Sequence, residues 1–124
     1  VLFFYIIGNG DSHLKNFSVI HGNTGAVRLA PAYDIVSSRL VMPNEQSDLA
    51  LTLNGKKNNI KLEDMKSFAD HLGIQKKALE RILDRFMKKN KLMSELILTS
   101  RLPAPAKKKL KGIIEERLKK INLP

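Results

Sequence analysis

The sequence contains no cysteine. A disulfide framework and a thiolate metal site are therefore excluded, and the composition fits a reducing compartment. Long hydrophobic runs are missing as well: the longest, residues 1–7, is far too short to cross a bilayer. This run also lacks the basic residues that precede the apolar core of a signal peptide. We therefore expect a cytoplasmic protein that makes no membrane contact.

The bulk composition is that of an ordinary globular chain. Its 124 residues, 43% hydrophobic and 27% charged, predict a single domain over residues 1–124. Residues 1–7 fit either a buried strand or the end of a buried helix. They open the chain without a cap or turn before them, so we expect a fragment or processed piece of a longer protein.

Positive charge is concentrated in the second half of the chain. Residues 1–54 carry three basic and four acidic side chains, whereas residues 55–124 carry 19 basic and 8 acidic ones. A surface of this sign attracts nucleic acid or an acidic protein. The Lys-rich residues 107–111 also fit the solvated face of an amphipathic helix, so we expect DNA contact to be weak or indirect.

Two small β-hairpins are predicted in the first half. The first joins residues 17–20 to residues 27–30 through a turn-rich loop. The second turns at an Asn-Gly dipeptide between residues 49–53 and 59–62, because both turn residues tolerate positive φ. Residues 37–48, which contain a Pro-Asn pair, predict an exposed loop between the two.

The second half is predicted to be helical. Apolar residues recur at helical spacing in residues 62–72, 79–97 and 110–121, with a stop at Gly73 and a break near Asn90. The fold class is therefore α+β, mostly α: small β-hairpins followed by about three helices that pack together.

The first hairpin is flanked by residues of phosphoryl-transfer chemistry. Residues 8–16 read GNGDSHLKN, which places Asn16 five positions after Asp11, and Asp34 follows 23 positions after Asp11. Phosphoryl transfer needs one carboxylate near the substrate hydroxyl, and an amide oxygen with a second carboxylate to hold the metal. Such oxygen ligands suit Mg²⁺. Asp, Asn and Gly also form ordinary polar turns, so spacing alone leaves a structural interpretation open.

Three longer motifs resemble the HipA family of bacterial toxin kinases. They are residues 8–18 (GNGDSHLKNFS), 29–35 (LAPAYDI) and 49–56 (LALTLNGK). The resemblance covers residues 1–75 through specific motifs and continues only as a pattern of helices. It implies the C-terminal lobe of a kinase-like fold and a serine/threonine protein kinase of a toxin–antitoxin system that uses ATP and Mg²⁺.

Site residues follow from this resemblance by position. Asp11 is expected to be the catalytic acid, and Asn16 and Asp34 are expected to be Mg²⁺ ligands. His13 is expected to stabilise charge on the transferring phosphoryl group, and Tyr33 to line the nucleotide pocket. The implied partners are a DNA-binding antitoxin of the HipB type and a protein substrate such as an aminoacyl-tRNA synthetase.

Two parts of a kinase cannot be found in the sequence, and the resemblance implies that they belong to an N-terminal lobe before residue 1, absent from this chain. A phosphate-covering loop and a lysine on an upstream strand are both needed, and Gly22 and Gly25 read instead as hairpin turn residues. We therefore expect this chain alone to be folded but catalytically silent. Two alternatives stay open: a non-catalytic module that binds an antitoxin or DNA, and a small-molecule kinase of the aminoglycoside-phosphotransferase type.

Overall fold

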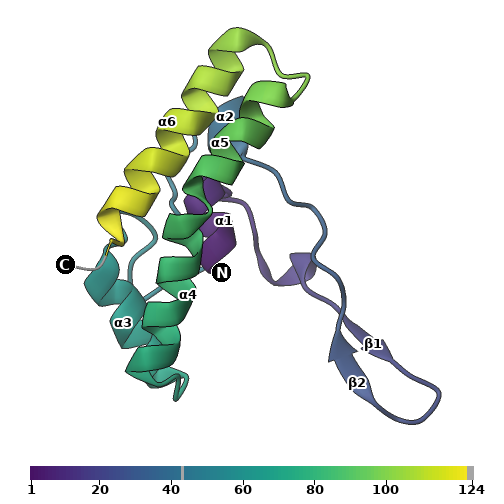
Figure 1. The fold of residues 1–124 in the computed structure, drawn as a ribbon. Helices are drawn as coiled ribbons and strands as arrows, with labels where there is room; N and C mark the ends of the chain where they lie inside the picture. Colours follow the sequence, from purple (N-terminus) through teal and green to yellow (C-terminus); the bar gives the residue numbers. More distant parts are fainter. Residues whose placement is uncertain (43, 123–124) are drawn as a thin grey trace.

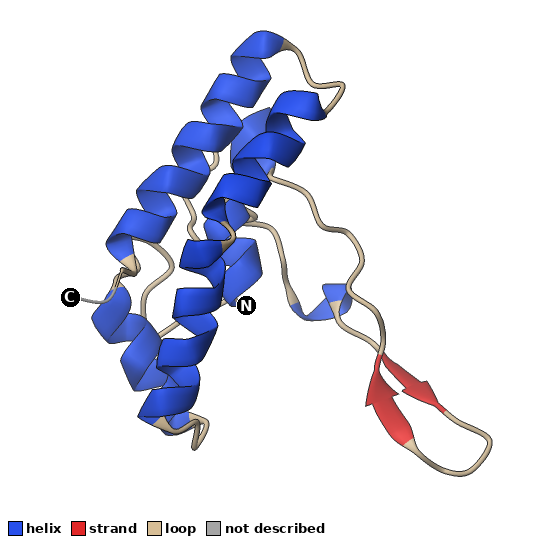
Figure 2. Cartoon of the chain, viewed as in Figure 1, coloured by secondary structure: helices blue, strands red, loops and turns tan. Residues whose placement is uncertain are grey.

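The structure, a computed structural model, describes residues 1–42 and 44–122, and helices dominate it (Figures 1 and 2). The helices are α1 (Leu2–Ile7), α2 (Ser38–Val41), α3 (Leu62–His71), α4 (Lys76–Lys88), α5 (Asn90–Thr99) and α6 (Ala104–Lys120), with a 3₁₀ turn η1 (Leu14–Asn16). Two strands, β1 (Val19–His21) and β2 (Val27–Leu29), pair antiparallel with Val19 opposite Leu29. The predicted α+β, mostly helical class is confirmed.

The apolar run at the start of the chain is the buried helix α1. Its side chains at Phe4, Tyr5 and Ile6 are buried. Gly8 ends the helix in the left-handed region at φ 72°, where its N–H and that of Asn9 bond back to carbonyls of the last turn. The strand interpretation of residues 1–7 is therefore wrong, because the backbone bonds close locally.

The helices of the second half follow the sequence prediction. α4 ends one residue before Lys89 and α5 begins one residue after it, which gives the predicted break near Asn90. α6 starts after Pro103 and lies against α1, α2 and α5, and Figure 1 shows α5 and α6 side by side. The core between these elements consists of Tyr5, Ile6, Leu49, Leu53, Ile60, Leu62, Met65, Leu83, Ile97, Ile114, Leu118 and Ile121.

The second predicted hairpin is reduced to a turn. Asn54 and Gly55 have the expected positive φ values, 52° and 74°. Only Leu53 and Lys56 form a β-bridge across them, and no regular strand flanks the turn in the described residues. The apolar side chains beside the turn, Leu49 and Ile60, enter the helical core. Burial against helices has therefore replaced strand pairing.

The predicted exposed loop over residues 37–48 is confirmed only in part, since residues 42, 44 and 46 are exposed and outside regular structure. Part of it forms α2, and both Ser38 and Asp48 are buried. Pro43, which contributed to the loop prediction, lies outside the described residues. The polar residues of this segment are buried because they bond to other parts of the fold, which local sequence does not show.

Asp48 is the centre of a buried ionic cluster. Its carboxylate contacts the guanidinium of Arg117, which is fully buried and lies over the ring of Tyr5 at 4.8 Å from the ring centre. The second carboxylate oxygen accepts the backbone N–H of Ile60 at 3.1 Å, and Arg39 approaches at 3.5 Å. Asp48 thereby connects the loop before α3 to helices α2 and α6, and Arg117 continues this contact to Tyr5 on α1.

Asp64 fixes the Asn54-Gly55 turn onto α3. The Lys56 ammonium at 2.8 Å, the Asn54 amide at 3.0 Å and the backbone N–H of Lys61 all donate to its carboxylate. These bonds, the one from Lys56 foremost, lower the pKa of Asp64 from 3.8 to about 2. Asp64 is itself buried in the first turn of the helix.

We predict that Asp64→Asn reduces the acid sensitivity of folding. Because the folded pKa lies below the unfolded one, the carboxylate contributes its stability above pH 3.8 and loses it as the pH falls towards about 2. The stability difference between variant and unsubstituted chain should therefore shrink over that window in urea unfolding. Glu63→Gln removes an exposed carboxylate from the same turn and serves as control. A difference that stays constant from pH 7 to pH 2 would contradict this account.

Within the described residues, no helix combines the length and apolarity required to cross a bilayer.

Candidate phosphoryl-transfer site

The predicted site residues lie on both sides of the β-hairpin. α1 ends at Gly8, and the acidic loop (residues 8–13) leads from it into η1. The chain then runs out along β1 and back along β2, so that residues 33–34 return beside η1. Figure 1 shows the hairpin projecting from the helices, and every residue of both strands is exposed. The hairpin therefore serves to bring the two motifs together.

Asn16 and Asp34 are in direct contact. The Asn16 amide nitrogen donates to a carboxylate oxygen of Asp34 at 2.5 Å. The other end of the amide, Oδ1, accepts the backbone N–H of His13 at 2.9 Å. Tyr33 adds a second link, because its hydroxyl donates to the Lys15 carbonyl at 3.0 Å. Three bonds thus hold residues 13–16 and 33–34 as one unit.

Asp34 has an uncommon backbone conformation. Its φ of 54° lies in the left-handed region, which few residues other than glycine adopt but which Asp and Asn tolerate best. Strain of this kind costs about 1–3 kcal/mol and tends to occur at functional positions. The contact with Asn16 and a bond to the Asp34 carbonyl from Asn9 hold the residue there.

Asp11 joins the same unit through a residue that sequence reasoning missed. The Asp11 side chain is exposed, and its backbone N–H donates to Asn9 Oδ1 at 3.1 Å. Asn9 is buried, and its Nδ2 donates to the Asp34 carbonyl at 3.4 Å. The sequence signal was limited to a Gly-Asn-Gly triplet next to Asp11, which reads as an ordinary break in regular structure.

All five predicted site residues therefore belong to one bonded network. Asp11, His13, Asn16, Tyr33 and Asp34 are linked by hydrogen bonds, directly or through Asn9 and the Lys15 carbonyl. Asp11, His13, Tyr33 and Asp34 are exposed and Asn16 is half-buried, so a ligand can reach them. What these residues do chemically stays a prediction.

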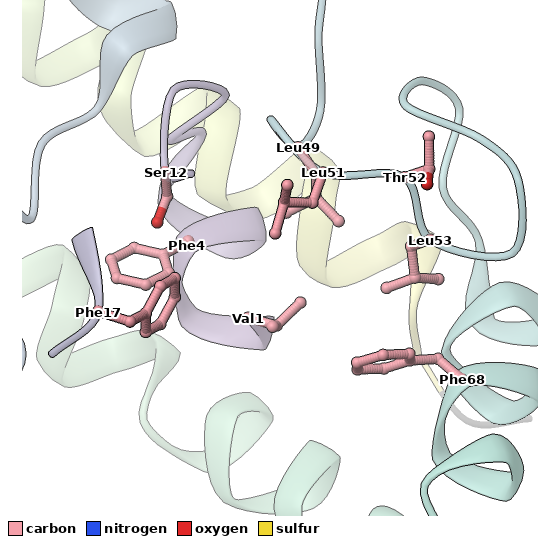
Figure 3. Close-up of a pocket in the computed structure, with 9 residues that line it drawn as sticks. All are labelled: Val1, Phe4, Ser12, Phe17, Leu49, Leu51, Thr52, Leu53 and Phe68. Carbon is pink, nitrogen blue, oxygen red and sulfur yellow. The ribbon is translucent and has the colours of Figure 1, made fainter. Parts of the chain in front are cut away.

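Two cavities adjoin the network. One of about 220 Å³ is lined by Asn16 and Tyr33 together with apolar residues of the hairpin and α1. Figure 3 shows the other, of about 100 Å³, where the buried Ser12 hydroxyl lies at a wall otherwise built mainly from apolar side chains such as Phe4 and Phe17. The first cavity is the one that Asn16 and Tyr33 line, and the role of Tyr33 beside a nucleotide stays a prediction.

The oxygen atoms of this network fit a hard cation. Among the described residues, no group of three or more His, Cys, Asp or Glu side chains could hold a metal. Mg²⁺ does not require one, since it usually takes one or two protein carboxylates and completes its shell with phosphates and water. Asp34 supplies a carboxylate, and the Asn16 amide lies against it with its nitrogen, while its oxygen accepts the His13 N–H. Both residues would present oxygen atoms to one ion only after the Asn16 amide group is reversed.

A family model described as the HipA-like C-terminal domain matches residues 1–92. The match covers the whole bonded network and extends through α4 into α5. The chain belongs to the HipA-like C-terminal domain family. The resemblance seen in the motifs is thereby confirmed.

Individual relatives agree with this family. The chain is 24% identical over 121 residues to a Haemophilus influenzae protein named "Putative kinase", covering 85% of this chain and 35% of that protein. It is 47% identical over 38 residues to the "Putative kinase Y4dM" of Sinorhizobium fredii, covering 31% of this chain and 9% of that protein. The chain thus spans about a third or less of the length of these relatives.

The fold is similar to that of a solved HipA structure. The chain superimposes with a TM-score of 0.74 on a chain of the Shewanella oneidensis toxin–antitoxin complex of HipA, HipB and operator DNA. The match covers 97% of this chain and 29% of the other, at 24% identity. The expected HipA C-terminal fold is therefore confirmed.

Proposed function

We propose that this HipA-like domain is the C-terminal lobe of a serine/threonine protein kinase of a bacterial toxin–antitoxin system. The contact between Asn16 and Asp34 is the observation that carries the proposal. It joins an amide and a carboxylate, from two motifs 18 residues apart, into the kind of pair that binds a metal ion in phosphoryl-transfer enzymes. The longer protein of which this lobe would be part is called the parent kinase below.

Each residue has a defined task in this proposal. Asp11 accepts the proton of the substrate hydroxyl and orients it, and its exposed carboxylate permits that approach. Asn16 and Asp34 hold Mg²⁺, which neutralises charge on the ATP phosphates when bound. Tyr33 lines the adjoining cavity, and its hydrogen bond to the Lys15 carbonyl fixes its ring. His13 stabilises charge on the transferring phosphoryl group.

The proposed partners are inferred from the complex of the Shewanella relative and from the charge of this chain. The Shewanella relative was solved with its HipB antitoxin and operator DNA. A HipB-type antitoxin is therefore the proposed protein partner, and the basic residues beyond position 54 would make only weak or indirect contact with DNA. The parent kinase would act in the cytoplasm on a protein substrate, with an aminoacyl-tRNA synthetase as the expected class.

The proposal is tested by phosphate transfer from γ-labelled ATP. The parent kinase should label serine or threonine in a protein substrate, and the label should depend on Mg²⁺. The 124-residue chain alone should bind ATP no tighter than about 1 mM, about −4 kcal/mol, because it lacks the loop and lysine that position the phosphates. Labelling of an aminoglycoside instead of protein would favour the small-molecule alternative, and antitoxin binding without any labelling would favour the non-catalytic one.

We predict that His13→Ala lowers the turnover of the parent kinase without unfolding the domain. The imidazole is exposed, and the backbone N–H of His13, not its ring, donates to Asn16. Loss of one group that stabilises transition-state charge typically lowers the rate by ~10²-fold or more. Turnover and the thermal midpoint should be measured together, with His21→Ala on exposed strand β1 as control. Unchanged turnover with a lower midpoint would make His13 a structural residue.

A further inference from the structure

The side chain of Asn9 touches the backbone of both predicted acids. Asn9 is 2% exposed, between Gly8 and Gly10. Its Oδ1 accepts the N–H of Asp11 at 3.1 Å, and its Nδ2 donates to the carbonyl of Asp34 at 3.4 Å. One amide group thus spans two positions that are 23 residues apart in sequence.

The cap of α1 does not require this side chain. The helix ends through backbone groups: the Gly8 N–H donates to the Tyr5 carbonyl at 3.1 Å and the Asn9 N–H to the Phe4 carbonyl at 2.9 Å. Both hydrogen bonds survive any substitution at position 9 other than proline. The two bonds of the Asn9 side chain therefore serve Asp11 and Asp34 alone.

A second clamp lies behind Asn9. The buried Ser38 hydroxyl accepts the N–H of Gly10 at 2.8 Å and donates to the carbonyl of Gly8 at 3.3 Å. The N–H of Arg39 donates to the same carbonyl at 3.1 Å. The segments that contain Asp11 and Asp34 are thus joined at two levels, by Asn9 near the acids and by Ser38 farther back.

The backbone of the acidic loop has little room to move. A Cβ atom at Gly10 would lie 2.5 Å from the Ser47 carbonyl oxygen, and one at Gly8 would lie 2.9 Å from the Ile113 side chain. The loop therefore rests directly on neighbouring backbone and core. Because its base is fixed in this way, the position of Asp11 relative to Asp34 depends on the bonds above the base, and those of Asn9 are the ones that reach the backbone of both acids.

We propose that Asn9 is a positioning residue that sets the separation between the Asp11 and Asp34 segments for phosphoryl transfer. The proposal rests on the proposed kinase function. Asn suits this position because a short amide offers one acceptor and one donor in opposite directions. An apolar residue of similar size would leave the Asp11 N–H and the Asp34 carbonyl without these partners. The two acids would then no longer be held at a fixed separation.

The test is Asn9→Leu in the parent kinase. The kcat should fall about 10- to 100-fold, because displacement of a reacting group by ~1 Å typically costs ~10²-fold. The KM for the protein substrate should change much less. Asn9→His, which restores one donor and one acceptor in its neutral form, should recover part of the lost kcat. Tyr5→Phe is the stability control, because it removes a buried bond to the Ile60 carbonyl and touches neither acid.

A second readout does not depend on activity. Amide hydrogen exchange at Asp11 should be faster in the Asn9→Leu form of the 124-residue chain than in the unsubstituted chain, while exchange at Ala30, bonded to the Ser18 carbonyl, stays the same. Loss of kcat no greater than in Tyr5→Phe, or unchanged exchange at Asp11, would overturn the positioning role. If the unsubstituted parent transfers no phosphate, the kinase proposal fails, and exchange at Asp11 alone decides whether Asn9 holds the loop.

Discussion

Replacing Asp11 with Asn should reduce phosphate transfer by the parent kinase by ~10²–10³-fold or more, because the amide cannot accept the proton of the substrate hydroxyl. Asp34→Asn should have an effect at least as large, since it removes the only carboxylate in contact with Asn16 among the described residues. Asn also tolerates the left-handed backbone of position 34, so the fold should be kept. Transfer of labelled γ-phosphate measures both effects.

The matched control for these variants is Asp70→Asn on α3. Asp70 is an exposed carboxylate outside the bonded network of Asp11, Asn16 and Asp34, so its loss should leave turnover unchanged. Circular dichroism of each variant should match the unsubstituted protein. Turnover within a few-fold of normal in Asp11→Asn or Asp34→Asn would remove the kinase assignment, because neither a catalytic acid nor a metal ligand can be lost at so small a cost in rate.

A second large effect is expected on stability. Asp48→Ala should lower the free energy of unfolding of the 124-residue chain by about 3–5 kcal/mol, the typical cost of breaking a buried ion pair on one side. The variant leaves the guanidinium of Arg117 buried without its closest counter-charge and the Ile60 N–H without its acceptor. The total free energy of unfolding of a small domain is only about 5–15 kcal/mol. Urea unfolding should therefore show a clearly lower midpoint.

Two further variants identify the cause of this loss. Glu116→Ala breaks an exposed pair with Lys120 on α6 and should cost less than about 1 kcal/mol. The double variant Asp48→Leu/Arg117→Met removes both buried charges and should be more stable than Asp48→Ala, because an apolar pair carries no desolvation cost. An Asp48→Ala chain as stable as Glu116→Ala would show that the buried pair contributes nothing.

That the candidate site residues lie together could be predicted from sequence because they are close to one another along the chain. Asp11, Asn16 and Asp34 lie within 24 consecutive residues, and the hairpin between them has turn residues that sequence reasoning interprets well. Asn9 was missed because its role depends on a bond to the Asp34 carbonyl. Every residue has a backbone carbonyl, so the sequence does not show which carbonyl a side chain will bond.

The errors in the predicted fold have the same cause. Asp48 was placed in an exposed loop, although it is buried against Arg117, 69 positions away. A charged residue in a turn-rich segment gives no sign of a partner so distant. The second hairpin was overpredicted for a related reason. The Asn54-Gly55 turn formed as expected, but its flanking apolar residues pack in the helical core instead of pairing as strands.

The helices were predicted well because their signal is local. Apolar spacing, the left-handed Gly73 (φ 69°) after α3 and Pro103 before α6 all act within a few residues. The short run at residues 1–7 was the exception, since seven apolar residues fit a strand and a helix equally. Only the backbone bonds at Gly8 and Asn9 decide between them.

The most direct measurement of the proposed site is to locate a bound metal ion on the chain. Mn²⁺ can replace Mg²⁺ and broadens nearby NMR signals, so it can be titrated into the 124-residue chain in the presence of a non-hydrolysable ATP analogue. The account predicts that signals of Asn16 and Asp34 broaden first, that Asp11 follows, and that Asp34→Asn abolishes the effect. Broadening that begins at another carboxylate, such as Asp70, or that persists in Asp34→Asn would contradict it.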